Sequence, residues 1–203
     1  TAPERPARVV VVDAGRGRRL ESFGLARTAA YLDIEVLPAA EGAAPTLVIL
    51  AQGADGTVRA LQRDAATGDR QGRVGFGQSL LPAALVVLPG GAASGPRLAL
   101  VGNDAAGALV VVAREAADGR LGARLVLSPS LAAIDAVATA GPGGDPRLTI
   151  VAADPAAGTV SLLSLDPVRG PQLSLFPLAI LVTGRPIARL GDVGGGPATD
   201  VGV

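Results

Sequence analysis

The sequence repeats itself at an interval of 51 residues, and the columns of matching residues run along its whole length. A single matching column is expected by chance, but six columns in register are not, so the chain is built from one repeated supersecondary unit. The columns hold to the interval or depart from it by one residue: Gly17, Gly68, Gly119 and Gly170; Asp13, Asp64, Glu115 and Asp166; Gly56, Gly107 and Gly158; Pro45, Pro96, Pro146 and Pro197; Val10, Leu61, Val112 and Leu163; Leu25, Phe76, Leu127 and Leu178.

Each repeat divides into four short apolar runs separated by turn residues. In residues 32–80 the runs lie at 33–37, 46–51, 57–63 and 73–78, which are strand-length segments rich in Val, Leu and Ile. The Asp55-Gly56 pair is typical of a tight hairpin, and Asp64 with Gly68 is typical of a turn that needs a capping carboxylate and a positive φ. Because no run long enough for a helix lacks Gly or Pro, the repeat predicts four antiparallel strands.

Four antiparallel strands in 51 residues have the size of a β-propeller blade. Residues 98–101 are apolar on both faces of a strand, as a sheet covered on both sides requires. We therefore predict an all-β fold, a β-propeller or propeller-like array of four-stranded antiparallel blades, forming a single repeat domain over residues 1–203. Its parts are a half blade at 7–31, full repeats at 32–80, 81–130 and 131–179, and a half blade at 180–203.

The two half blades are complementary in phase. Residues 7–25 match the third and fourth strands of a repeat, and residues 187–203 match the first and second. Two interpretations are open at this point. The two ends could pair and close a four-bladed ring without open edges, or the sequence could be a fragment of a longer array cut inside a blade.

The composition excludes several common kinds of catalytic and metal-binding site. The chain has no His or Cys, and every one of its eighteen basic residues is Arg. The usual general base, thiolate metal sites and Schiff-base lysines are therefore absent, and we expect a protein that is not an enzyme. Eighteen acidic residues balance the charge, which argues against nucleic acid as a partner. No apolar run approaches the roughly 20 residues of a membrane span.

Two turn tracts carry a resemblance to a known family. They are residues 63–68 (RDAATG) and 114–119 (REAADG), and residues 36–38 and 87–89 add a Val-Leu-Pro tract before the next loop. These tracts resemble FG-GAP/VCBS-type repeats of bacterial surface proteins, which are related to the integrin α-chain propeller. The resemblance implies an extracellular, cell-surface or periplasmic protein with a structural or adhesive function. It also implies a protein or glycan partner and no required cofactor.

The same resemblance implies calcium-binding loops of the D-x-D/N-x-D/N-G-x-x-D type. The nearest match is residues 191–200, where Asp192 and Asp200 keep the outer acidic spacing while Gly194 and Gly196 replace the middle ligands. Calcium takes six to eight oxygen ligands, so a calcium site at Asp192 and Asp200 is a secondary hypothesis beside a glycine-rich connector. The matching loops of the other repeats contain Glu41, Ser94 and Asp145.

Three alternative functions stay open. The first is a calcium-dependent ligand- or glycan-binding propeller, and the second is an accessory subunit of a larger cell-envelope assembly or filament. The third and least favoured is a carboxylate-based glycan-active enzyme that would use Asp33 and Glu35 on one predicted strand, with Asp135 at the repeat position of Asp33. The scarcity of catalytic residue types and of aromatic rings for stacking on sugars argues against an enzyme.

Overall fold

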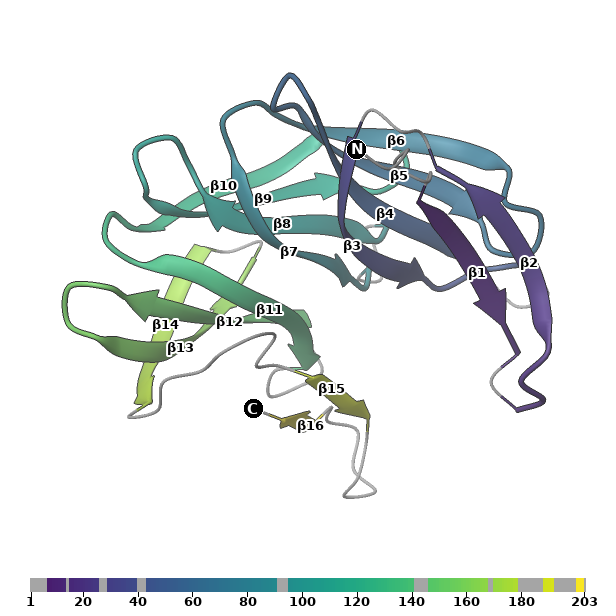
Figure 1. Cartoon of the computed structure of the whole chain (residues 1–203). Helices are drawn as coiled ribbons and strands as arrows, with labels where there is room; N and C mark the ends of the chain where they lie inside the picture. Colours follow the sequence, from purple (N-terminus) through teal and green to yellow (C-terminus); the bar gives the residue numbers. More distant parts are fainter. Residues whose placement is uncertain are drawn as a thin grey trace, which may run out of the picture. The chain divides into compact units, whose positions relative to one another are not determined.

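A computed structural model describes residues 7–13, 15–25, 29–39, 43–90, 95–140, 146–167, 170–178, 188–191 and 200–202 (Figure 1). All the regular structure in these residues is β, and within each sheet consecutive strands pair in antiparallel fashion. The first four-stranded sheet contains β3 (Ala29–Leu37), β4 (Thr46–Gly53), β5 (Val58–Asp64) and β6 (Arg70–Gly77). The second contains β7 (Leu81–Leu88), β8 (Arg97–Asn103), β9 (Leu109–Glu115) and β10 (Leu121–Ser128). The third contains β11 (Ala132–Ala140), β12 (Pro146–Asp154), β13 (Thr159–Asp166) and β14 (Gly170–Leu178).

Two further strand pairs occupy the predicted half blades. β1 (Arg8–Val12) pairs with β2 (Arg19–Gly24), and β15 (Ala188–Gly191) pairs with β16 (Asp200–Gly202). The predicted all-β class and the four-stranded antiparallel pattern are therefore confirmed. The four predicted runs of residues 32–80 fall on β3 to β6, with ends that differ by at most four residues.

The chain forms two compact units, Thr1–Gln78 and Ser79–Val203. In the first unit, β4 is buried on both faces from Leu47 to Ala51. The turn between β5 and β6 packs on the β1–β2 pair, because a Cβ atom placed on Gly68 would lie 2.6 Å from Cδ1 of Phe23. The Arg63 guanidinium lies over the same Phe23 ring, 5.4 Å from its centroid.

In the second unit, two sheets share one apolar core. Ala84, Val86 and Leu88 of β7 belong to the same buried cluster as Leu148 and Ile150 of β12. The first strands, β7 and β11, lie side by side, whereas the fourth strands, β10 and β14, meet only over a short stretch. β8 is buried on both faces, as its sequence predicts.

The glycine and proline columns correspond to repeated turns. Gly17, Gly68 and Gly119 all have positive φ, between 62° and 75°, and each donates its N–H to the carbonyl of the acidic residue four positions earlier. The carbonyls of Pro45 and Pro96 accept the N–H groups of Ala65 and Ala116, respectively, at 2.9 and 3.0 Å. The glycine turn was predicted, whereas the role of the proline carbonyl was not.

β-Bulges also recur with the repeat. On the first strands, the pairing skips one residue at each of three positions that are 51 residues apart, and the same happens on the fourth strands. A bulge changes which face the flanking side chains point to, so these positions decide which residues share a surface. The bulged residues are Leu32, Ala83 and Ile134 on the first strands and Leu20, Gln71 and Gly122 on the fourth strands.

Candidate functional site

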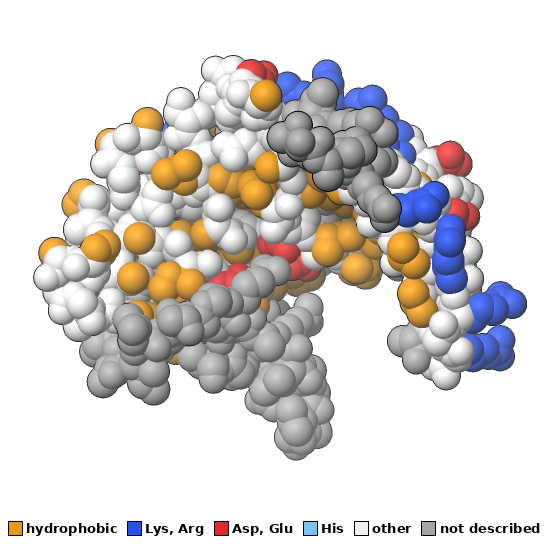
Figure 2. Space-filling model, viewed as in Figure 1, with side chains coloured by type: hydrophobic (Ala, Val, Ile, Leu, Met, Phe, Trp, Pro, Cys, Tyr) orange, Lys and Arg blue, Asp and Glu red, His pale blue; other side chains and the backbone are white. Residues whose placement is uncertain are grey.

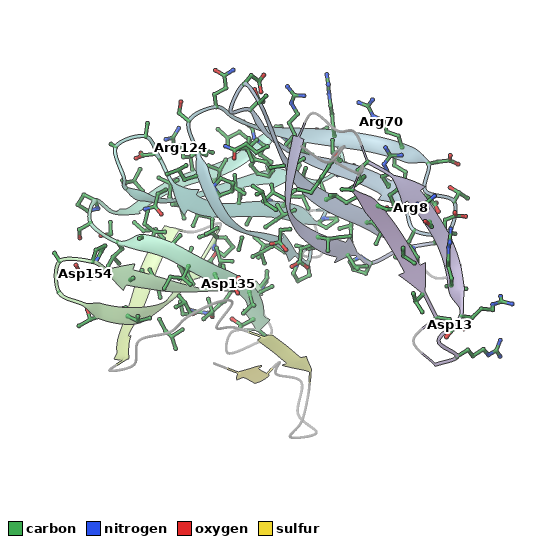
Figure 3. The ribbon with its side chains drawn as sticks, viewed as in Figure 1. Arg8, Asp13, Arg70, Arg124, Asp135 and Asp154 are labelled. Atoms are coloured by element: carbon green, nitrogen blue, oxygen red, sulfur yellow. The ribbon has the colours of Figure 1, made fainter. Side chains whose placement is uncertain are left out.

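Two aspartates of the acidic column, Asp13 and Asp64, serve turn geometry. Asp64 Oδ1 accepts the N–H groups of Ala66 at 2.7 Å and Thr67 at 3.0 Å. Asp13 accepts two N–H groups of its own turn in the same way, at the end of the β1–β2 hairpin (Figure 3). These carboxylates therefore replace missing backbone acceptors, which is the ordinary structural use of aspartate in a turn.

Glu115, the third member of the column, has a different partner. Its Oε1 forms an ion pair with Arg97 Nε at 2.8 Å, between directly opposite residues of β8 and β9. Both side chains are mostly buried, at 20% and 13% exposed. The longer glutamate side chain therefore joins two strands instead of capping the turn.

The carboxylates at the hairpin tips are also engaged by backbone groups. Asp104 accepts the N–H groups of Ala106 and Ala108. Asp154, at the tip between β12 and β13, accepts those of Ala156 and Ala157 (Figure 3). Hydrogen bonds from the Thr57 backbone and hydroxyl, with a smaller contribution from the Arg59 charge, hold the pKa of Asp55 below its usual value. The tight hairpin predicted at Asp55-Gly56 is confirmed.

The aspartates of the first strands make the same local hydrogen bond in two repeats. Asp33 Oδ1 accepts the N–H of Ile34 at 2.9 Å, and Asp135 Oδ1 accepts the N–H of Ala136 at the same distance. Each aspartate directly follows the bulged residue of its strand. Asp135 is 1% exposed, whereas Asp33 and Glu35 are half-buried on one face of β3. Asp33 belongs to the first compact unit and Asp135 to the second.

The predicted calcium ligands fall at the limit of what the structure describes. Asp192 lies outside the described residues, and for Asp200, the first residue of β16, only the backbone is described. The related loop residues Glu41, Ser94 and Asp145 also lie outside the described residues. Within the described part of the chain, no three His, Cys, Asp or Glu residues gather as a metal site would require. The calcium hypothesis therefore stays a prediction.

Sequence reasoning missed the role of Asn103 in joining two sheets. Asn103 Oδ1 accepts the N–H of Ala133 at 2.9 Å, and Nδ2 donates to the carbonyls of Leu131 at 2.7 Å and Gly107 at 2.8 Å. One amide side chain thus ties the end of β8 to the start of β11 in the next sheet. The aligned repeats give little indication of this role, because Gln52 and Asp154 occupy the positions that match Asn103.

The first unit exposes an apolar strand face and many arginines. Leu32, Ile34 and Val36 of β3 are exposed at 44%, 48% and 52%. Leu85, at the repeat position of Ile34, is completely buried. Figure 2 shows arginine side chains along the side of the unit that carries β1, β2 and β6. The exposed face was missed because sequence alternation places Leu32, Ile34 and Val36 on one face but does not reveal whether another sheet covers that face.

None of the described residues belongs to a helix long and apolar enough to cross a membrane. No protein-family model matches the sequence, and a search of curated proteins finds no match.

Proposed function

We propose that this chain is a β-propeller-type repeat protein of the FG-GAP/VCBS kind that acts as a non-catalytic structural or adhesive module. Its surface would engage a protein or glycan partner outside the cell, at the cell surface or in the periplasm. The packing in the second unit supports the propeller. Its two sheets meet along their first strands and separate toward their fourth, which is how blades fan out from an axis.

The observation that carries the non-catalytic function is the use of the repeated carboxylates. Asp13 and Asp64 accept backbone N–H groups in equivalent turns, and Asp55, Asp104 and Asp154 do so at the hairpin tips. A catalytic acid or base must be able to reach a substrate proton, and these groups are occupied in holding the backbone. The repeated residues therefore serve architecture, and binding is left to the surfaces between them.

The exposed strand β3 supplies such a surface. Ile34 and Val36 leave about half of their side-chain area in water, whereas the apolar residues Leu47–Ala51 of the neighbouring strand β4 are buried. Contiguous exposed apolar surface on a folded protein is typical of an interaction site. The exposed face of β3 also supports a second candidate function, that of an accessory subunit of a larger cell-envelope assembly. Light scattering of the purified chain at rising concentration tests it, since that function expects a mass above 20.0 kDa.

A turnover assay tests the non-catalytic function against the enzyme alternative. The purified chain is incubated with neutral and acidic polysaccharides, and release of reducing ends is measured beside the Asp33→Asn/Glu35→Gln double variant. We expect no release above the buffer blank from either protein. Release by the wild-type chain that the double variant loses, with the variant still folded by circular dichroism, would make the protein a glycan-active enzyme.

A further inference from the structure

Three arginines share one face at the outer edge of the first unit. In the pairing of β5 with β6, Arg70 lies directly opposite Arg63 and Arg73 lies directly opposite Leu61, with Gln71 bulged between them. Directly opposite residues of an antiparallel pair point to the same face, and so do Leu61 and Arg63, which are two residues apart. Arg63, Arg70 and Arg73 therefore lie on one face, with the Cα atoms of Arg70 and Arg73 about 7 Å apart.

This arrangement concentrates positive charge that the described residues do not neutralise. Like charges placed directly opposite on paired strands destabilise a sheet, and Arg63 and Arg70 form such a pair. Within the described part of the chain, none of the three arginines forms an ion pair. The nearest acids in sequence have other partners: Asp64 accepts turn N–H groups and the Gln71 amide, and Asp69 accepts the Thr67 hydroxyl.

Arg63 is held in place from two sides. Its Nη1 donates to the carbonyl of Gly68 at 2.8 Å, and its guanidinium lies over the Phe23 ring. Its Nε is buried and has no hydrogen-bond partner among the described residues. The guanidinium is therefore held in position beside the two exposed arginines Arg70 and Arg73, which concentrates fixed positive charge for an anionic group.

The corresponding positions of the next repeat keep the held arginine, since Arg114 Nη1 donates to the Gly119 carbonyl at 2.8 Å, but they lack the group of three arginines. They hold Arg114, Leu121 and Arg124, so an apolar residue replaces the middle arginine. Arg124 also has a carboxylate within reach, since its Nη2 lies 4.0 Å from Asp104 Oδ2. The uncompensated triad is therefore specific to the first full repeat within the described residues, and blade architecture does not require it.

We propose that Arg63, Arg70 and Arg73 form a binding site for the carboxylates of an acidic polypeptide segment. This inference rests on the proposed function as an interaction module and names the partner chemistry. Arginine binds carboxylates through two parallel hydrogen bonds, which suits glutamate and aspartate side chains. Single-stranded nucleic acid is less suited, because it needs free aromatic platforms and the Phe23 ring is already covered by Arg63.

A peptide titration tests the site on the full chain. Fluorescence anisotropy follows a labelled oligoglutamate peptide at low ionic strength, with an oligoglutamine peptide of the same length as the blank. We expect saturable binding of oligoglutamate only, weakened at least about tenfold in the Arg70→Gln/Arg73→Gln variant and weakened again by added salt. The matched control is Arg59→Gln on the same sheet, since Arg59 already faces Asp55 at 3.8 Å, and its affinity should stay within about twofold of wild type.

Three outcomes would overturn the site. They are the absence of saturable oligoglutamate binding by the folded wild-type chain, an equal loss of affinity in the Arg59→Gln control, and tighter binding of polygalacturonate or oligothymidine at matched charge.

An alternative use of edge arginines is to prevent edge-to-edge association, and it predicts self-association of the double variant with no peptide binding by wild type. The peptide titration tests only the arginine site, whereas the turnover assay tests the proposed non-catalytic function. A negative titration therefore rejects the site without rejecting the proposed function.

Discussion

Asn103 at the end of β8 accepts a hydrogen bond from the N–H of Ala133 at the start of β11, so one side chain joins two neighbouring sheets. The same amide donates to the carbonyl of Leu131 at 2.7 Å. Both partners are backbone groups at the point where the chain enters the next sheet. The packing of two four-stranded sheets in the second unit therefore depends on a polar contact as well as on the apolar core between them.

Replacing Asn103 with Ala should destabilise the chain by about 2 kcal/mol, because it leaves partly buried backbone groups without partners. Urea unfolding followed by circular dichroism measures the change. Asp118→Ala is the control, since Asp118 is exposed and makes one hydrogen bond within its own turn. Equal stability losses in the two variants would mean that the amide does not join the sheets.

Gly68→Ala should destabilise the protein more than Gly56→Ala does. Both glycines have φ near +75°, so both substitutions carry a backbone cost of about 1 kcal/mol. At Gly68 the new Cβ would also lie 2.6 Å from Phe23 Cδ1, whereas at Gly56 it would meet nothing within 4 Å. We expect a difference of about 1–3 kcal/mol in the free energy of unfolding. A difference near zero would show that the turn does not pack on Phe23.

The Asp55 carboxyl should titrate below the usual range of an aspartate in the folded chain. Because its folded-state pKa is lowered, its stabilising contribution is present above the unfolded-state pKa and is lost as the pH falls through the folded-state pKa. NMR titration of the carboxyl carbon measures this pKa directly. Thr57→Val removes the hydroxyl and keeps the backbone donor, so the pKa should rise part of the way toward its usual value. An unchanged pKa in that variant would assign the shift to the backbone and Arg59 alone.

Calcium provides a separate test of the loop that contains Asp192 and Asp200. We expect millimolar calcium to leave the melting temperature within about 1 °C of its value in chelator, because two acids supply too few ligands for a strong site. Differential scanning calorimetry makes the comparison. A rise of several degrees in wild type that Asp192→Asn removes would favour the calcium-dependent alternative instead.

The strands and turns could be predicted from the sequence because residues of the same type recur at the same turn positions in successive repeats. Gly68 and Gly119 lie where a turn needs positive φ, and Asp64 lies where that turn needs an acceptor, so aligned copies gave the pattern without a structure. The apolar runs fell on strands because the Val- and Leu-rich segments were short and flanked by glycine.

The bulges and the surfaces that depend on them could not be predicted in this way. Arg70 and Arg73 are three residues apart, so plain strand alternation places them on opposite faces, and only the extra residue at Gln71 brings them to one face. Asn103 was equally hidden, because its partners lie about 30 residues further along the chain. Long-range pairing and local register shifts leave no periodic signal in a single sequence.

The central claim is that the four-stranded sheets fan out from their first strands as propeller blades. The chain contains no Cys, so spin labels can be attached to introduced cysteines alone. Pulsed electron resonance would compare a first-strand pair, Leu81→Cys with Ala132→Cys, and a fourth-strand pair, Arg124→Cys with Leu175→Cys. The account predicts that the fourth-strand distance exceeds the first-strand distance by about 10 Å or more, since four strands span about 14 Å. Equal distances would mean two sheets stacked in parallel planes, which would contradict the propeller.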